Sequence, residues 1–321
     1  MCPTTEVILI IFPDLFFNIF LIANLLNKNV DVKFISITFL HESSSTISYL
    51  VVDEVTKSVA LIDPVADYDI STGKMTHSFS DKIVNKIRSC NYSLDWIIET
   101  HVHADHVSDA QYFKSELGGK IAIGGRIKEV QETFASIYDE DKLFPCDGSQ
   151  FDYLISPDEI IQIGELEARA ISTPGHTPAC MSYLIGISLF VGDSIFMPDF
   201  GTARCDFPGG SARDLYASAK KLVSLPDETR VFVGHDYGPG GRPIAWETTI
   251  AAEKQSNIHV GDGINLEEFV GMRETRDAQL NLPGMIIPAI QINMRAGKLP
   301  GPSENGVSYL KTPINSFPGL K

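Results

Sequence analysis

The sequence contains the stretch Glu99-Thr100-His101-Val102-His103-Ala104-Asp105-His106, which places three imidazoles and one carboxylate within six residues. A packed core cannot easily satisfy so many imidazole nitrogens, and a solvated surface has no use for them. Histidine and aspartate at this density are therefore best explained as metal ligands. The apolar residues 94–98 predict a buried strand, so the cluster follows the end of a strand.

The two-residue repeat of an extended chain predicts where the side chains of this cluster point. If the chain stays extended, His101 and His103 point the same way. We expect Asp105 and His106 to begin the helix that residues 107–117 suggest, which Gly118 and Gly119 would end.

Strands and helices alternate from Val32 onward, which predicts an α/β fold. β-Branched and aromatic residues indicate the strands, and apolar residues at helical spacing indicate the helices. The predicted strands are 32–38, 45–53, 58–63, 94–98, 120–123, 166–172, 189–191 and 230–233, and the predicted helices are 80–90, 107–117, 126–137 and 211–225.

One pattern recurs three times in the second half: an apolar strand, a sharp turn with glycine, and a candidate ligand. The three ligands are His176, Asp193 and His235. Loops at strand ends tolerate irregular backbone while the sheet fixes their position, as a catalytic site requires. The complete candidate set is His101, His103, Asp105, His106, His176, Asp193 and His235.

These seven residues could hold two metal ions, or one ion with the other side chains as hydrogen-bonding support. Two zinc ions would share a water with a pKa lowered towards about 7, which suits hydrolysis of an ester or thioester. One Fe(II), held by two histidines and one carboxylate with open positions, would activate O2. The same nitrogen and oxygen donors suit zinc, iron and manganese, so the sequence leaves the metal open.

Four motifs resemble, in order and spacing, the metallo-β-lactamase superfamily: His101-Val102-His103-Ala104-Asp105-His106, Pro174-Gly175-His176-Thr177, Val191-Gly192-Asp193 and Gly234-His235-Asp236-Tyr237. The resemblance covers nearly everything from Val32 onward. It implies a metallo-β-lactamase-type αββα sandwich, in which two mixed β-sheets lie face to face with helices outside and metals at one edge.

Two further segments are similar to the persulfide dioxygenase branch of that superfamily, beside glyoxalase II. Residues 201–207 resemble its Gly-x-Gly-Arg-Thr-Asp-Phe segment, and Leu282-Pro283 with residues 292–297 resembles its C-terminal segment. Glyoxalase II enzymes carry a longer helical C-terminal domain, whose basic and tyrosine contacts with glutathione we do not find here. Residues 197–201 resemble instead a bacterial subgroup of β-lactamase-like hydrolases.

The resemblance implies a persulfide dioxygenase that oxidises glutathione persulfide, a small thiol substrate, to sulfite and glutathione. One Fe(II) per chain would be held by His101, His176 and Asp193. The remaining candidates would be catalytic residues that orient the ligands, or would hold a second metal; these are His103, Asp105, His106 and His235. The alternative is a glyoxalase II-like hydrolase of a glutathione thioester, with two Zn(II) bridged by Asp193.

A strongly acidic protein needs a local cation to receive the carboxylates of glutathione. Arg204 matches the arginine of the family segment, with a structural ion pair to Asp206 as the alternative. Tyr237 could hydrogen-bond the substrate or simply cover the end of the sheet. His77 and His259 lie far from every motif, and we expect both on the surface.

Composition limits the class of protein and its partners. A chain of 321 residues with 44% hydrophobic content can bury a large core. The net charge of −15 argues against a nucleic-acid partner. Five scattered cysteines without a CxxC spacing favour a reducing compartment, which predicts a cytoplasmic protein. The oligomeric state, monomer or homodimer, stays open.

The N-terminal residues 7–26 are strongly apolar but interrupted by Pro13 and Asp14, with no Lys or Arg before them. Three alternatives are a membrane or signal anchor, a packed extra helix, and an extension outside the domain. An anchor would give membrane contact or export. We predict residues 1–31 as an apolar extension and residues 32–321 as the catalytic domain with a short C-terminal extension.

Overall fold

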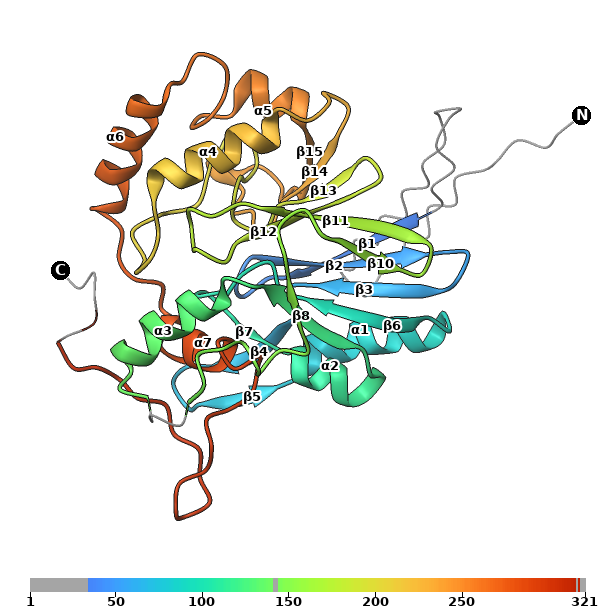
Figure 1. The fold of residues 1–321 in the computed structure, drawn as a ribbon, viewed down its shortest axis with the longest axis vertical. Coiled ribbons are helices and arrows are strands. Elements are labelled where there is room, and N and C mark those ends of the chain that lie inside the picture. Colours follow the sequence, from blue (N-terminus) through green and yellow to red (C-terminus); the bar gives the residue numbers. More distant parts are fainter. Residues whose placement is uncertain (1–33, 141–143, 316, 318–321) are drawn as a thin grey trace, which may run out of the picture.

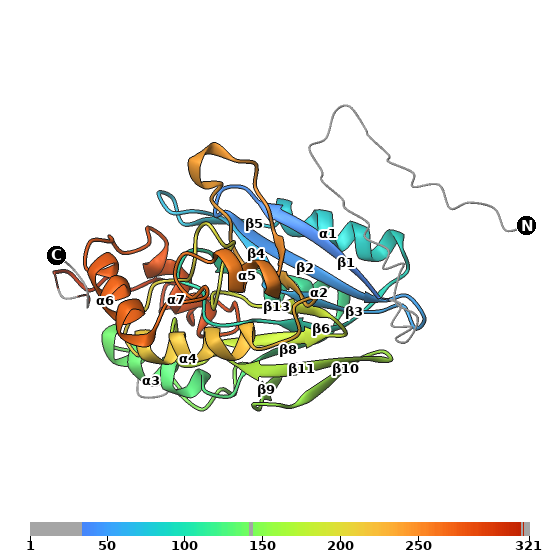
Figure 2. The ribbon, with the colours of Figure 1, turned by 90° about the horizontal axis from the view of Figure 1, so that it is seen from above.

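Two β-sheets lie face to face between two layers of helices. The computed structural model describes residues 34–140, 144–315 and 317. Within them, helices cover the outer face of each sheet, so the order of layers is α, β, β, α (Figures 1 and 2). The αββα sandwich predicted from the sequence is therefore confirmed.

The first sheet contains the strands that lead to the histidine cluster. Its order is β1 (Phe34–His41), β2 (Thr46–Asp53), β3 (Ser58–Ile62), β6 (Ser93–Ile98), β8 (Lys120–Gly124) and β9 (Tyr153–Ile155). A small sheet of β5 (Lys74–Thr76), β4 (Val65–Asp69) and β7 (Val107–Ser108) lies beside it. The helices on this side are α1 (Ser78–Ser89), α2 (Ala110–Leu117), α3 (Ile127–Ile137) and α7 (Ile286–Asn293) (Figure 1).

The second sheet carries the other candidate ligands. Its order is β10 (Ile160–Ile163), β11 (Leu166–Ser172), β12 (Met181–Ile185), β13 (Ser188–Phe190), β14 (Arg230–Phe232) and β15 (Glu247–Thr249). The helices on its outer side are α4 (Ala212–Val223), α5 (Ile250–Ser256) and α6 (Leu266–Asp277) (Figure 1). A short 3-10 turn lies at Pro239–Gly241.

Strand β2 is buried along its whole length because both of its faces are covered. Side chains alternate between the two faces of a strand. Tyr49 therefore points to the second sheet, where its ring lies 5.1 Å from Phe190 and 5.6 Å from Phe232. Leu50 and Val52 belong to the cluster that packs under the helices of the first layer. One core therefore lies between the two sheets, and the other lies between the first sheet and its helices.

Parallel strand pairs bring the candidate site together. Strand β3 pairs in parallel with β6, and β13 pairs in parallel with β14. The carboxyl ends of parallel strands lie at the same edge of a sheet. The loops after β6, β13 and β14, which carry the histidine cluster, Asp193 and His235, therefore start from common edges.

The helix predicted to begin at Asp105 and His106 is wrong. Residues 101–106 form a loop, Val107 and Ser108 form strand β7, and α2 begins at Ala110. The reason is tertiary pairing: Val107 pairs with Ala66 and Ser108 with Val65 of β4, which overrides the local helical pattern. The other predicted strands and helices agree with the structure to within a few residues of each end, as far as the chain is described.

The predicted N-terminal extension, with its apolar residues 7–26, lies outside the described residues, and the domain division at residue 32 stays a prediction. In the described part of the chain, no helix combines the length and the apolar character needed to cross a membrane. The described cysteines are free thiols.

Helix α7 holds the loop that follows β6. The Asn293 side-chain amide donates to the carbonyls of His103 and His106 at 2.9 and 2.8 Å, and its oxygen accepts from the Ser108 amide at 2.8 Å. Asn293 is buried, and its side chain takes the place of water as the hydrogen-bonding partner of these backbone groups. One side chain thus replaces the regular hydrogen bonds that a loop lacks.

We expect Asn293→Leu to lower the free energy of unfolding by about 3 kcal/mol, because an unpaired buried polar group costs about 1–3 kcal/mol and three would be left. Urea unfolding followed by circular dichroism measures the change. Asn305→Leu, at an exposed turn, is the control and should change stability by about 0.5 kcal/mol or less. Equal stabilities of the two variants would contradict this role of Asn293.

Candidate metal centre

Seven side chains from the strand ends converge in two groups. In each group, one ligand atom per side chain lies within 4.8 Å of the others. The three-residue group is His101, His176 and Asp193; the four-residue group is His103, Asp105, His106 and His235. The sequence predicted all seven as candidates, and the structure brings them together. Their roles as ligands or catalytic residues stay predictions.

The three-residue group is arranged around the carboxylate of Asp193. Its Oδ2 lies 3.8 Å from Nε2 of His101 and 3.8 Å from Nε2 of His176. The Nδ1 of His101 lies 2.9 Å from the Thr100 hydroxyl, and the Nδ1 of His176 donates to the carbonyl of Arg204 at 2.7 Å. Each ring is therefore held through Nδ1 and presents Nε2 to the centre, as metal-binding histidines do.

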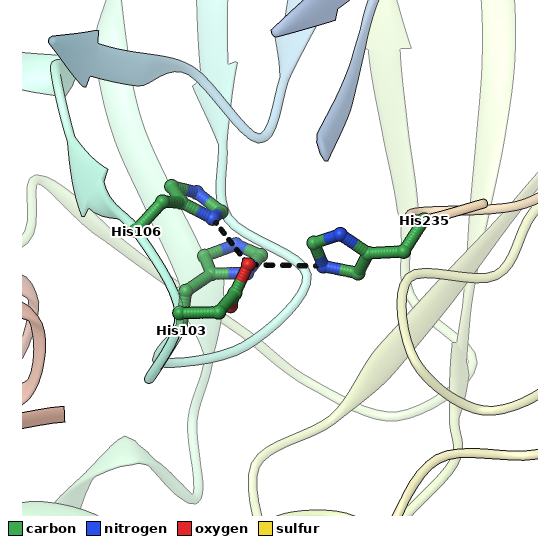
Figure 3. Close-up of side chains that lie close together, drawn as sticks. His103, His106 and His235 are labelled. Atoms are coloured by element: carbon green, nitrogen blue, oxygen red, sulfur yellow. Dashed lines mark hydrogen bonds and ion pairs between the residues drawn. The ribbon is translucent and has the colours of Figure 1, made fainter. Parts of the chain in front are cut away.

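The four-residue group surrounds the carboxylate of Asp105, whose Oδ2 lies 3.2 Å from His106 Nδ1 and 3.4 Å from His235 Nε2 (Figure 3). His235 donates from Nδ1 to the carbonyl of Ser45 at 3.1 Å. Its Nε2 also lies 3.6 Å from Asp193 Oδ1. Asp193 thus lies between the two groups and contacts both.

Several polar atoms of the centre are buried and have no partner in the protein. They are Nε2 of His101, Nδ1 of His103, Nε2 of His106 and Oδ1 of Asp193. Burying an unpaired polar atom is costly, and a cation bound by these atoms would compensate. Imidazole nitrogens with a carboxylate oxygen suit zinc and iron alike. The residues present therefore fit a metal, and they do not choose which one.

The charge states agree with this interpretation for two of the rings. Burial lowers the pKa of His101 well below its usual range and lowers that of His106 to about 4. Both imidazoles are therefore neutral near pH 7, as a metal ligand must be. Burial opposes the charge of Asp105, but His235 and His106 outweigh it and hold the pKa of that carboxyl well below its usual range.

His103 has a different environment, which sequence reasoning missed. Its Nε2 lies 3.1 Å from Asp63 and 3.4 Å from Glu99, and both carboxylates are buried. Burial alone would lower the pKa of His103, but the two carboxylates, Asp63 foremost, raise it well above the usual value. Asp63 is the last residue of the predicted strand 58–63 and directly follows the observed β3, so the recurring strand-then-ligand pattern could have revealed it.

Arg204 has its guanidinium engaged within the protein. It binds Asp206 at 2.6 and 2.7 Å and the carbonyl of Asn281 at 2.6 Å, and its side chain is 13% exposed. The ion pair considered as the alternative is therefore present. Its backbone carbonyl, which sequence reasoning did not consider, orients His176.

Tyr237 lies at the exposed side of the centre. It is 48% exposed, and its ring is stacked 6.1 Å from His235 and lies 4.9 Å from Phe200. Nearly half of the residue is therefore open to solvent beside His235. Substrate contacts by Tyr237 and Arg204 stay predictions.

The expected surface position of His259 is wrong, because its ring is buried under the loop that leads to Arg204. Its Nδ1 accepts from the Thr202 amide at 2.9 Å. Gly201 has φ +91°, and a Cβ there would lie 2.2 Å from His259 Nδ1. The ring therefore fits only because residue 201 is glycine.

Glu253 supports the same loop from helix α5. Its carboxylate is fully buried, accepts from the Asn257 amide at 2.6 Å and leaves Oε1 without a partner. Asn257 in turn donates to the carbonyl of Gly201 at 3.2 Å. Burial raises the pKa of Glu253 from 4.5 to about 8.

The raised pKa of Glu253 predicts a pH-dependent loss of stability. Between pH 4.5 and about 8 the unfolded chain loses the proton that the folded protein keeps, so its contribution to stability is complete at low pH and falls as the pH rises. Glu253→Gln removes this effect because it is neutral and has the same shape. Its stability relative to wild type should increase by about 3 kcal/mol from pH 5 to 8.

Denaturant unfolding at a series of pH values measures this difference. Glu167→Gln, on the exposed face of β11, is the matched control and should follow the wild type. A constant difference between Glu253→Gln and wild type over this pH range would show that Glu253 is ionised in the folded protein.

Comparison with known proteins agrees with this geometry. The family model described as the metallo-beta-lactamase superfamily matches residues 45–235, which include all seven candidate residues. The chain belongs to the metallo-beta-lactamase superfamily. The superfamily membership predicted from the four sequence motifs is thereby confirmed.

Three relatives show where the chain lies within the superfamily. It is 45% identical to a probable metallo-hydrolase of Burkholderia pseudomallei over 289 residues, covering 87% of this chain and 98% of the relative. It is 48% identical to glyoxylase B2 of Dictyostelium discoideum over 274 residues, covering 85% of this chain and 94% of that relative. The crystal structure of ETHE1 from Myxococcus xanthus aligns with a TM-score of 0.66 at 29% identity, covering 82% of this chain and 99% of the ETHE1 chain. The last likeness supports the persulfide dioxygenase-like branch.

Proposed function

We propose that the protein is a mononuclear iron persulfide dioxygenase that oxidises glutathione persulfide to sulfite and glutathione. The alternative, a dinuclear zinc hydrolase of a glutathione thioester, is considered below. Both use the same seven side chains, and they differ in how many of them bind metal.

The observation that carries the proposal is the separate group of His101, His176 and Asp193. Two histidines and one carboxylate are the ligand set of non-haem iron oxygenases, which leave positions open for O2 and substrate. His103, the nearest further candidate, lies between Asp63 and Glu99. These carboxylates accept the Nε2 proton of His103, and His103 has no contact with Asp193, around which the three-residue group is arranged. The three-ligand proposal therefore rests on His101, His176 and Asp193 as a group of their own.

Iron bound to this group would supply O2 activation, and the chain itself would supply orientation and shielding. The Thr100 hydroxyl and the Arg204 carbonyl fix the rings of His101 and His176. The buried ring of Phe207 lies edge-on to His176 at 5.4 Å and limits access of water from that side. The exposed Tyr237 is the residue best placed to contact the thiol substrate.

Similarity to ETHE1 of Myxococcus xanthus supports this proposal, together with the segment 201–207 that resembles the persulfide dioxygenases. The identity of 29% is lower than the 45% with the probable metallo-hydrolase and the 48% with glyoxylase B2, which support the hydrolase alternative.

The test begins with protein purified without oxygen, its metal content and its O2 uptake with glutathione persulfide. We expect about one iron per chain and O2 consumption with release of sulfite. Asp193→Ala should lose the iron and the uptake. Asp105→Ala is the matched control, because it removes a carboxylate of the four-residue group and should leave the iron bound. About two zinc ions with thioester cleavage and no O2 uptake would contradict the proposal.

The alternative hydrolase is favoured by the four-residue group, in which Asp105, His106 and His235 lie close enough to hold a second metal. Asp193 also contacts both groups, as a bridging carboxylate would. In this case lactoylglutathione would be cleaved by the zinc-loaded protein, and Asp105→Ala would lose one of two zinc ions with most of that activity.

Substrate contact by Tyr237 gives a further prediction. Tyr237→Phe keeps the ring against His235 and removes one hydroxyl, so loss of one hydrogen bond should raise KM about fivefold with kcat little changed. Steady-state kinetics with glutathione persulfide measures the change. Tyr153→Phe, on the distant strand β9, is the control. An unchanged KM in Tyr237→Phe would show that this hydroxyl does not contact the substrate.

A further inference from the structure

A chain of hydrogen bonds connects His41, outside the metal centre, to His106 inside it. The Nδ1 of His41 lies 2.8 Å from the Ser44 hydroxyl, which lies 2.7 Å from the Thr46 hydroxyl. The Thr46 hydroxyl lies 3.2 Å from Nδ1 of His106. At its other end, Nε2 of His41 lies 3.3 Å from a carboxylate oxygen of Asp67. All of these links lie in the turn between β1 and β2 or beside it.

When His41 is neutral, the donors and acceptors set one direction for the hydrogen bonds between His41 and His106. A carboxylate only accepts, so His41 donates from Nε2 to Asp67 and accepts at Nδ1 from Ser44. Each hydroxyl has one proton. Ser44 gives its proton to His41, so its oxygen accepts from Thr46 at 2.7 Å, a shorter contact than the 3.4 Å between the Thr46 hydroxyl and Asp105 Oδ2. The Thr46 oxygen then accepts from His106. The result is a proton on Nδ1 of His106 and a free electron pair on Nε2, the atom that is buried without a partner.

The neutral form of His41 agrees with its surroundings. The ring is buried and lies edge-on to Phe79 at 5.0 Å. Burial lowers its pKa, and so does Lys82, while Asp67 and Asp105 act in the opposite direction and are outweighed. Ser43 also lies 3.1 Å from Nε2, and its hydroxyl can accept the same proton as Asp67.

The same turn positions a second ring of the four-residue group. The Ser45 carbonyl accepts from Nδ1 of His235, and the Ile47 amide donates to the carbonyl of Gly234 at 2.8 Å. Ser45 has a positive φ of 55°, so its backbone is set in an unusual conformation for this contact. His106 and His235 thus both depend on residues 44–46 for the orientation of Nδ1.

We propose that His41 is a positioning residue of the metal centre: through Ser44 and Thr46 it fixes His106 in the tautomer that leaves Nε2 free for a metal. This rests on the ability of the four-residue group to take a metal, as in the hydrolase alternative; in the mononuclear dioxygenase the same tautomer leaves His106 Nε2 unprotonated beside the iron site. Asp105 also lies 3.2 Å from Nδ1 of His106 and is the rival orienting group. The two can be separated by removing His41 and leaving Asp105 in place.

The test is nitrogen-15 NMR of the histidine side chains in metal-free protein. We expect a single Nδ1–H tautomer of His106 in the wild type and a mixture of tautomers in His41→Leu and Ser44→Ala. His41→Gln should restore the wild-type pattern, because its amide can accept from Ser44 and donate to Asp67. His77→Leu, a histidine that binds Asp109 elsewhere, is the control.

A second measurement uses zinc titration of the metal-free protein. The affinity for zinc at the step that involves His106 should fall about tenfold in His41→Leu and in Ser44→Ala, and should stay near the wild-type value in His41→Gln. Circular dichroism establishes that each variant is folded. His106 nitrogen shifts that stay those of the wild type in both folded His41→Leu and Ser44→Ala would overturn the proposal and assign the tautomer to Asp105.

Failure of this proposal is distinguishable from failure of the proposed function. A tautomer that depends on His41, in a protein that takes up no O2 with glutathione persulfide, would support the positioning role and reject the dioxygenase. O2 uptake with a tautomer that does not depend on His41 would do the reverse.

Discussion

A buried imidazole has two nitrogens to satisfy, and at this centre one of them is always held by the protein. Thr100, Asp63, Thr46, the Arg204 carbonyl and the Ser45 carbonyl supply those contacts. Because two of the partners are backbone carbonyls, the path of two loops is set by the rings that they hold. Buried residues beneath these loops hold the loops in place, and the loops in turn hold the rings.

The loop near Arg204 shows how far this requirement extends. His259 and Asn257 each bind its backbone, and Arg273 donates to the Thr202 carbonyl at 3.1 Å while paired with Asp277. Asp277 accepts from the amide of Cys205 at 2.8 Å. The residues that follow α5, together with helix α6, thus contribute polar side chains that hold the loop beside His176, although they are distant from it in sequence.

Much of the fold and of the centre could be predicted from the sequence, since both follow from local patterns. Alternating apolar strands with glycine turns identified the strand ends, and the density of His and Asp identified the seven candidates. What the pattern could not give were partners distant in sequence, such as Asp63 for His103 and a backbone carbonyl for His176. The start of α2 was wrong because pairing with β4 competes with helix formation, and His259 was misplaced because its burial depends on a loop 57 residues away.

The contact between Asn293 and the loop of His103 has a consequence for biosynthesis. The two residues are 190 positions apart, so the side chain that holds the loop is synthesised long after the loop itself. Both sheets can pair while the chain is still being made, since domains begin to fold from their N-terminal parts. The loop cannot take its final shape until α7 is synthesised and docked. The candidate metal centre is therefore complete only after translation has passed residue 293.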